Sequence, residues 1–163
     1  MMGFAFECAV MKELILMSHV ALGVGCIVAT VWVFVDVLNA RAENLGRIRW
    51  MSRLAAACMW LAFVAGGYWY VTDYKVDKAV ILKGAWPFAH NLFMETKEHF
   101  VITLLLVATY LPIAASNNLA VNPGARRLVL WVAALMVVLG LMAEGNGGVI
   151  AMGVKMGLLG QTH

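Results

Sequence analysis

Four long apolar stretches, at about residues 14–38, 54–71, 100–115 and 128–143, make up almost half of this 163-residue chain. A helix needs about 20 predominantly apolar residues to cross the hydrocarbon layer of a membrane. Composition agrees, because 63% of the residues are hydrophobic and 13% are charged, whereas soluble domains have about 25% charged residues. The sequence therefore predicts an all-α integral membrane protein, a single four-helix domain over residues 1–163.

The segments around these stretches contain residues that interrupt or end helices. Asn122-Pro123-Gly124 predicts a turn before the fourth helix. After that helix, the run 145–148 (Gly-Asn-Gly-Gly) predicts a break, and the apolar tail at 149–159 is too short to cross a membrane. We therefore expect a short interfacial segment at the C-terminus.

Basic residues predict the orientation of the helices. Two short connections on one face carry all the arginines: Arg41, Arg47, Arg49, Arg53, Arg126 and Arg127. The lysines of the opposite face are spread over long segments and mixed with acidic residues. Since positive charge in short loops marks the cytoplasmic side, we expect both termini outside, in a bacterial inner membrane. The net charge of +3 then reports topology, and no nucleic acid partner is predicted.

Ionisable side chains gather near the predicted outer face. They are His19, His90, Glu95, Glu98, His99 and Glu144. Such groups near the apolar layer usually have partners. Gly23, Gly67 and Gly140 fall in the same outer half and would leave room for a flat, bulky ligand. Imidazoles from two helices are a common way to hold haem iron, so the sequence predicts one haem b between His19 and His99, bound non-covalently because no CxxCH motif is present.

Other readings of these residues stay open. His90 could replace His99 as a ligand, although its place in an amphipathic lead-in indicates a surface residue. A transition-metal site could instead use the two ligands of the predicted haem together with Glu95 and Glu144. Against it, Glu95 and Glu98 alternate with Lys97, which indicates a solvated helix face. At the opposite end, Asp36 is expected to pair with Arg41 or another loop arginine.

Several short motifs occur in a recognisable order. Ser18-His19 lies at the start of the first helix and Asp36 at its end. Gly66 and Asp73 lie near the end of the second helix. His99 opens the third helix, and Gly147-Gly148-Val149-Ile150 and Gly153-Val154 follow the fourth. This order resembles a widespread bacterial family of four-helix membrane domains of unknown function, sometimes fused to or encoded with Rieske iron–sulfur modules. That family often has His-Pro and a second His at the start of the first helix, where this chain has the single His of Ser18-His19-Val20. The resemblance implies a membrane redox association without naming a reaction.

Three functions remain as hypotheses. The first is a cytochrome-b-like subunit that passes electrons between a quinol or a partner and a periplasmic acceptor of the cytochrome c or Rieske type. The second is a cofactor-free accessory or scaffold subunit of a larger membrane complex, and the third is an outer-face metal-binding protein. No pair of nucleophile and base is visible, so no catalytic residue is predicted.

Overall fold

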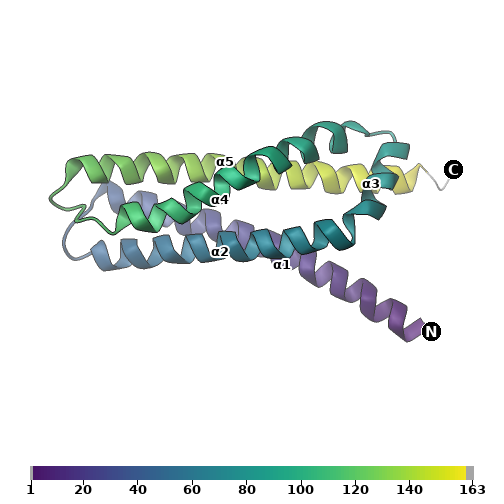
Figure 1. Cartoon of the computed structure of the whole chain (residues 1–163), viewed down its shortest axis with the longest axis horizontal. Coiled ribbons are helices and arrows are strands. Elements are labelled where there is room, and N and C mark those ends of the chain that lie inside the picture. Colours follow the sequence, from purple (N-terminus) through teal and green to yellow (C-terminus); the bar gives the residue numbers. More distant parts are fainter. Residues whose placement is uncertain (1, 161–163) are drawn as a thin grey trace.

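The computed structural model describes residues 2–160, without the side chains of residues 2–6, 8 and 9. Within that part the chain forms five α-helices and one π-helical segment. In chain order they are α1 (Met2–Leu38), α2 (Leu45–Thr72), α3 (Tyr74–Lys83), η1 (Ala89–Met94), α4 (Glu95–Ala115) and α5 (Pro123–Leu159). The loops α1–α2 and α4–α5 lie at one end of the bundle, and both termini and α3 lie at the other (Figure 1). We call these the arginine end and the terminus end.

Four helical segments are long and apolar enough to cross a membrane. They are Val10–Leu38, Leu45–Thr72, Ala89–Ala115 and Pro123–Leu159. Large apolar side chains cover their outer faces, and Trp131, for example, is 72% exposed. Such continuous apolar surface is unusual for a soluble monomer. The predicted all-α fold with four membrane-length helices is confirmed, and each helix extends beyond the apolar stretch predicted for it.

The predicted break at 145–148 is wrong, because α5 runs without interruption through this run to Leu159. An interfacial position for the last part of α5 stays a prediction. One glycine costs a helix only about 1 kcal/mol, and packing offsets this here. Asn146 Nδ2 donates to the carbonyl of Phe93 at 3.3 Å, which joins α5 to η1. The small residues of this segment therefore serve helix packing.

Two further glycines bring α5 against its neighbours at the terminus end. A Cβ atom on Gly153 would lie 2.6 Å from the Cβ of Ala89, and one on Gly157 would lie 2.6 Å from the carbonyl oxygen of Val80. Gly157 also faces Gly84, whose Cβ would lie 2.6 Å from the Gly157 Cα. Small residues four apart allow this close approach of helices. The last part of α5 is thus packed against both α3 and η1.

Side chains of α1, α2, α4 and α5 form the main apolar core. Val33, Ile48, Leu111, Val129 and Met136 are fully or almost fully buried within it. They occupy the part of the bundle between the arginine end and the middle of the helices. Thr30 and Ser52 are buried in the same part of the bundle, and each hydroxyl donates to a carbonyl of its own helix.

Arginines fasten the helices together at the arginine end. Arg47 donates two hydrogen bonds to the Asp36 carboxylate, at 2.6 and 2.7 Å, so the predicted pairing of Asp36 with a loop arginine is confirmed. Arg126 donates to the carbonyl of Leu38 at the end of α1. Arg49 donates to the carbonyl of Ser116, just beyond α4, at 3.0 Å. Cations at helix C-termini satisfy carbonyls that the helix leaves free.

Candidate functional site

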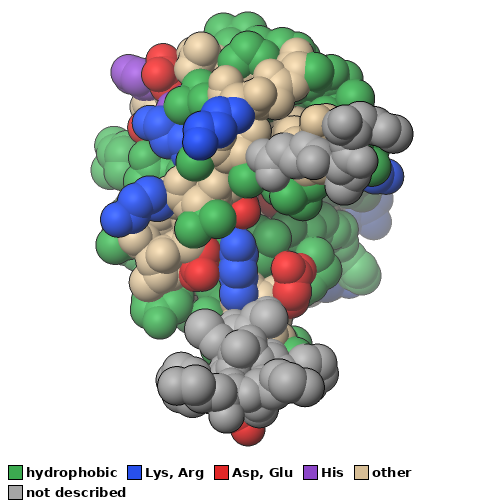
Figure 2. All heavy atoms as spheres, turned by 90° about the vertical axis from the view of Figure 1, so that its right-hand side faces the viewer, with side chains coloured by type: hydrophobic (Ala, Val, Ile, Leu, Met, Phe, Trp, Pro, Cys, Tyr) green, Lys and Arg blue, Asp and Glu red, His purple; other side chains and the backbone are tan. Residues whose placement is uncertain are grey.

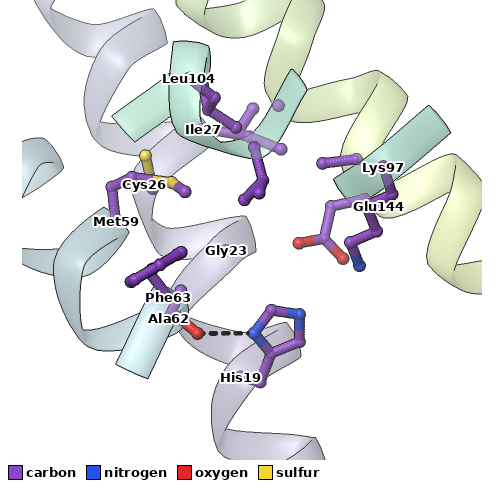
Figure 3. Close-up of a pocket in the computed structure, with 13 residues that line it drawn as sticks. His19, Gly23, Cys26, Ile27, Met59, Ala62, Phe63, Lys97, Leu104 and Glu144 are labelled. Atoms are coloured by element: carbon purple, nitrogen blue, oxygen red, sulfur yellow. Dashed lines mark hydrogen bonds between the residues drawn. The ribbon is translucent and has the colours of Figure 1, made fainter. Parts of the chain in front are cut away.

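A cavity of about 40 Å³ lies inside the bundle, between α1, α2, α4 and α5 (Figure 3). Its lining includes one imidazole, one ammonium group and one carboxylate, from His19, Lys97 and Glu144. Each lies roughly 20 residues along its helix from the arginine end, or about 30 Å at 1.5 Å per residue. That length matches the hydrocarbon thickness of a bilayer. We call it the polar cavity after these three side chains, and it lies about one bilayer thickness from the arginine end.

His19 is held in a defined orientation by α2. Its Nδ1 lies 2.8 Å from the carbonyl oxygen of Ala62. Because a carbonyl only accepts hydrogen bonds, Nδ1 carries a proton and donates it. Nε2 is then the nitrogen that can take up or release a proton. Figure 3 shows the ring on the cavity side of α1, facing Glu144 and Lys97.

Lys97 and Glu144 enter the polar cavity from α4 and α5. Their opposite charges attract each other. Within the described residues, however, the two form no ion pair at 4.0 Å or less and no side-chain hydrogen bond. Their hydrogen-bonding capacity is therefore left for something else in the cavity. The volume suits about one water molecule, whose share of the liquid is about 30 Å³.

Each ionisable side chain lies against a glycine of a neighbouring helix. A Cβ atom on Gly66 would lie 2.5 Å from Nδ1 of His19, and one on Gly23 would collide with the Glu144 carboxylate. A Cβ atom on Gly147 would lie 3.4 Å from Nζ of Lys97. These glycines make room for the polar side chains themselves.

The space beside the glycines of the predicted haem site can be compared with the size of a haem. The space at Gly23 is filled by Glu144, and at Gly140 a Cβ atom would lie 2.9 Å from Ile27 Cγ1. Gly67 has nothing within 4 Å of where its Cβ would be. The remaining volume of about 40 Å³ is far smaller than a haem. The residues present thus do not fit a haem in this arrangement.

The structure does not bring together the predicted ligands. His99 is exposed, its Nδ1 bonds to the carbonyl of Glu95 in its own helix, and it does not line the polar cavity. Glu95 is also exposed. Among the described residues, no three His, Cys, Asp or Glu side chains are grouped closely enough to hold a metal ion. A haem or a metal site at His19 and His99 therefore stays a sequence prediction without structural support.

Lys97 is the site residue that sequence reasoning missed, because it was assigned to a solvated face with Glu95 and Glu98. The helical period places it otherwise. Lys97, Val101, Leu104, Ala108 and Leu111 recur every three or four residues, and the last three are buried in the core. Lys97 therefore belongs to the inward stripe of α4, whereas a residue two positions further along, such as His99, faces away from it.

His90 is not the surface residue that its amphipathic surroundings indicated. It is only 5% exposed, and its Nδ1 lies 2.9 Å from the Tyr74 hydroxyl oxygen. The pair lies between α3 and η1 and does not line the polar cavity. His90 therefore replaces neither His19 nor His99 as a cavity ligand.

No family model, curated protein or solved structure matches this chain.

Proposed function

We propose that this chain is a multi-pass protein of a bacterial inner membrane that binds and releases protons at the polar cavity. Its termini would lie outside, as the arginines gathered at the arginine end favour. A single observation carries the proposal: three protonatable side chains, His19, Lys97 and Glu144, come from three helices to a cavity of water size. Ionisable groups at membrane depth are costly and therefore usually functional.

The chemistry of the three groups suits proton exchange. A proton that enters from the terminus end can be held on the Glu144 carboxylate or on Nε2 of His19. A water molecule in the cavity would carry it between the two. Lys97 offsets the negative charge of Glu144 when the carboxylate is ionised, without closing the site through a direct ion pair. The site can thus change its protonation state without rearranging the bundle.

We infer that the cavity exchanges protons with one membrane face only. Toward the arginine end it is closed by apolar core side chains, among them Val33, Leu105 and Met136. Thr30, a buried polar residue of α1 in this region, donates its hydroxyl to the Cys26 carbonyl of the same helix. In the part of the chain that the structure describes, apolar side chains thus separate the cavity from the arginine end. We infer that the chain works as an accessory subunit, which exchanges protons with one face for a larger membrane enzyme.

Infrared difference spectroscopy of the full chain in lipid nanodiscs tests the proposal. As pH is lowered, we expect a protonated-carboxyl band from a site shielded from bulk water. Glu144→Gln should lose this band, whereas Glu95→Gln, on the exposed face of α4, should keep it. The proposal is wrong if the band persists in Glu144→Gln. Haem bands in a reduced-minus-oxidised optical spectrum would also contradict it, because a haem would have to displace Glu144 from its glycine.

A further inference from the structure

A second pair of chemically active side chains lies outside the polar cavity and has no part in the proposed proton exchange. Tyr74, the first residue of α3, is 2% exposed, and His90 of η1 is 5% exposed. The Tyr74 hydroxyl oxygen and the His90 Nδ1 lie 2.9 Å apart. In the tautomer protonated at Nε2, the phenol donates this hydrogen bond and the imidazole accepts it.

Electron-rich rings surround the phenol on its other sides. The ring of Tyr70 stacks on that of Tyr74, with centroids 5.3 Å apart and planes 20° apart. The indole of Trp69 lies 5.4 Å away, centroid to centroid. Tyr70 is 41% exposed, so a stack of two phenol rings leads from the protein surface to the buried pair.

Burial controls how Tyr74 can lose an electron. It raises the pKa of the Tyr74 phenol, and the charges of Glu98 and Asp77 act in the same direction. The phenolate is therefore not available near neutral pH. Removal of an electron from the neutral phenol requires that its proton leave as well, and Nδ1 of His90 already lies at hydrogen-bond distance.

His90 has charged neighbours of both signs. Glu95 and Glu98 interact favourably with a protonated imidazole, and Lys78 opposes them. Burial opposes the imidazolium more strongly than any of these charges acts on it. The surroundings therefore favour return of the proton to Tyr74 together with the electron.

We propose that Tyr74 and His90 form a proton-coupled redox site that gives one electron to an oxidised metal centre at the membrane surface. Tyr74 loses one electron and its O–H bond breaks. The proton forms an N–H bond at Nδ1 of His90, and the metal centre is reduced by one electron. The product is a neutral tyrosyl radical beside an imidazolium, and the return of one electron reverses both transfers.

The test uses photogenerated tris(bipyridine)ruthenium(III) as the metal oxidant, with the full chain in nanodiscs. The chain has four tyrosines, and Tyr68, Tyr70 and Tyr110 are all at least 41% exposed. We expect electron paramagnetic resonance to detect a long-lived tyrosyl radical in the natural chain. The signal should persist in the triple variant Tyr68→Phe, Tyr70→Phe, Tyr110→Phe, and the long-lived fraction should be lost in Tyr74→Phe.

Phenylalanine at position 70 keeps the ring that stacks on Tyr74 and loses the hydrogen bond from the Tyr70 hydroxyl to Glu98, so the triple variant leaves the Tyr74–His90 pair in place. Its failure to form a long-lived radical would overturn the proposal. His90→Leu tests the proton acceptor in the same background: we expect loss of the g-value shift that a hydrogen bond from imidazolium produces. An unchanged g value in His90→Leu would show that His90 takes no proton. Neither outcome depends on Glu144, so this proposal and the proton-exchange proposal fail or stand separately.

Discussion

The arginine end and the polar cavity treat their charged groups in opposite ways. At the arginine end, Asp36 accepts two short hydrogen bonds from Arg47, while Arg49 and Arg126 donate to carbonyls at helix ends. In the polar cavity, Lys97 and Glu144 share a small volume without a direct ion pair among the described residues. Charges of both signs are present in each region, but only one region uses them to join helices.

The difference separates a structural role from a functional one. A scaffold gains from satisfying every polar group, because an unsatisfied one costs free energy in an apolar interior. The surface of the terminus end also follows this rule in part, since Lys12 and Asp77 approach to 3.4 Å and link α1 to α3. Seen from that end, basic and acidic side chains lie among apolar ones (Figure 2). Groups left apart inside the bundle, as in the polar cavity, are the ones available for exchange with protons and water.

Gly157→Ala should have the largest effect on stability, and it acts only at the terminus end. Its Cβ would lie 2.6 Å from the Val80 carbonyl oxygen, a backbone atom that cannot move alone. We expect the free energy of unfolding to fall by about 3 kcal/mol, the upper range for overpacking, as measured by thermal unfolding in nanodiscs. Gly46→Ala near the arginine end, where nothing lies within 4 Å, should cause no loss. If the two variants lost the same unfolding free energy, the helices would not be packed more closely at the terminus end than at the arginine end.

Asp36→Asn should have the next largest effect. The substitution removes the charge that strengthens both hydrogen bonds from Arg47, and solvent around the exposed guanidinium keeps the loss of unfolding free energy below that of Gly157→Ala. Lys97→Met removes the charge that offsets Glu144 while keeping a long apolar stem, and we expect a smaller loss of unfolding free energy because the carboxyl can take up a proton instead. The same thermal measurement compares the two variants. A larger loss in Lys97→Met would show that Lys97 has a structural role after all.

The positions of the helices and the level of the site along them could be predicted from the sequence. The direction in which the side chains of the site face could not. Apolar length predicts a spanning helix because hydrocarbon leaves few other structures possible. Rise per residue then places His19 and Glu144 at one depth, and the structure does bring them to one cavity. Facing depends on helix rotation, and for α4 the charges around Lys97 indicated water although the apolar period indicated the core.

Two other errors have one cause, which is packing between segments distant in sequence. The run 145–148 was expected to break the helix, yet its small residues let η1 and α4 approach α5. His90 was expected at the surface, yet α3 covers it and supplies the Tyr74 hydroxyl. Local sequence contains no information on a partner that a separate helix provides, so neither contact could be predicted from it.

Gly66→Ala should have a smaller effect on stability and a specific effect on the polar cavity. Its Cβ would lie 2.5 Å from Nδ1 of His19, so the ring has to move and its hydrogen bond to Ala62 is strained. We expect a loss of about 1.5 kcal/mol, together with a shift of the infrared band assigned to Glu144. Gly67→Ala is the matched control, because nothing lies within 4 Å of that position. It should leave the band unchanged and gain slightly in helix propensity. If both variants left the band in place, His19 and Glu144 would not share one site, and the polar cavity would be as structural as the arginine end.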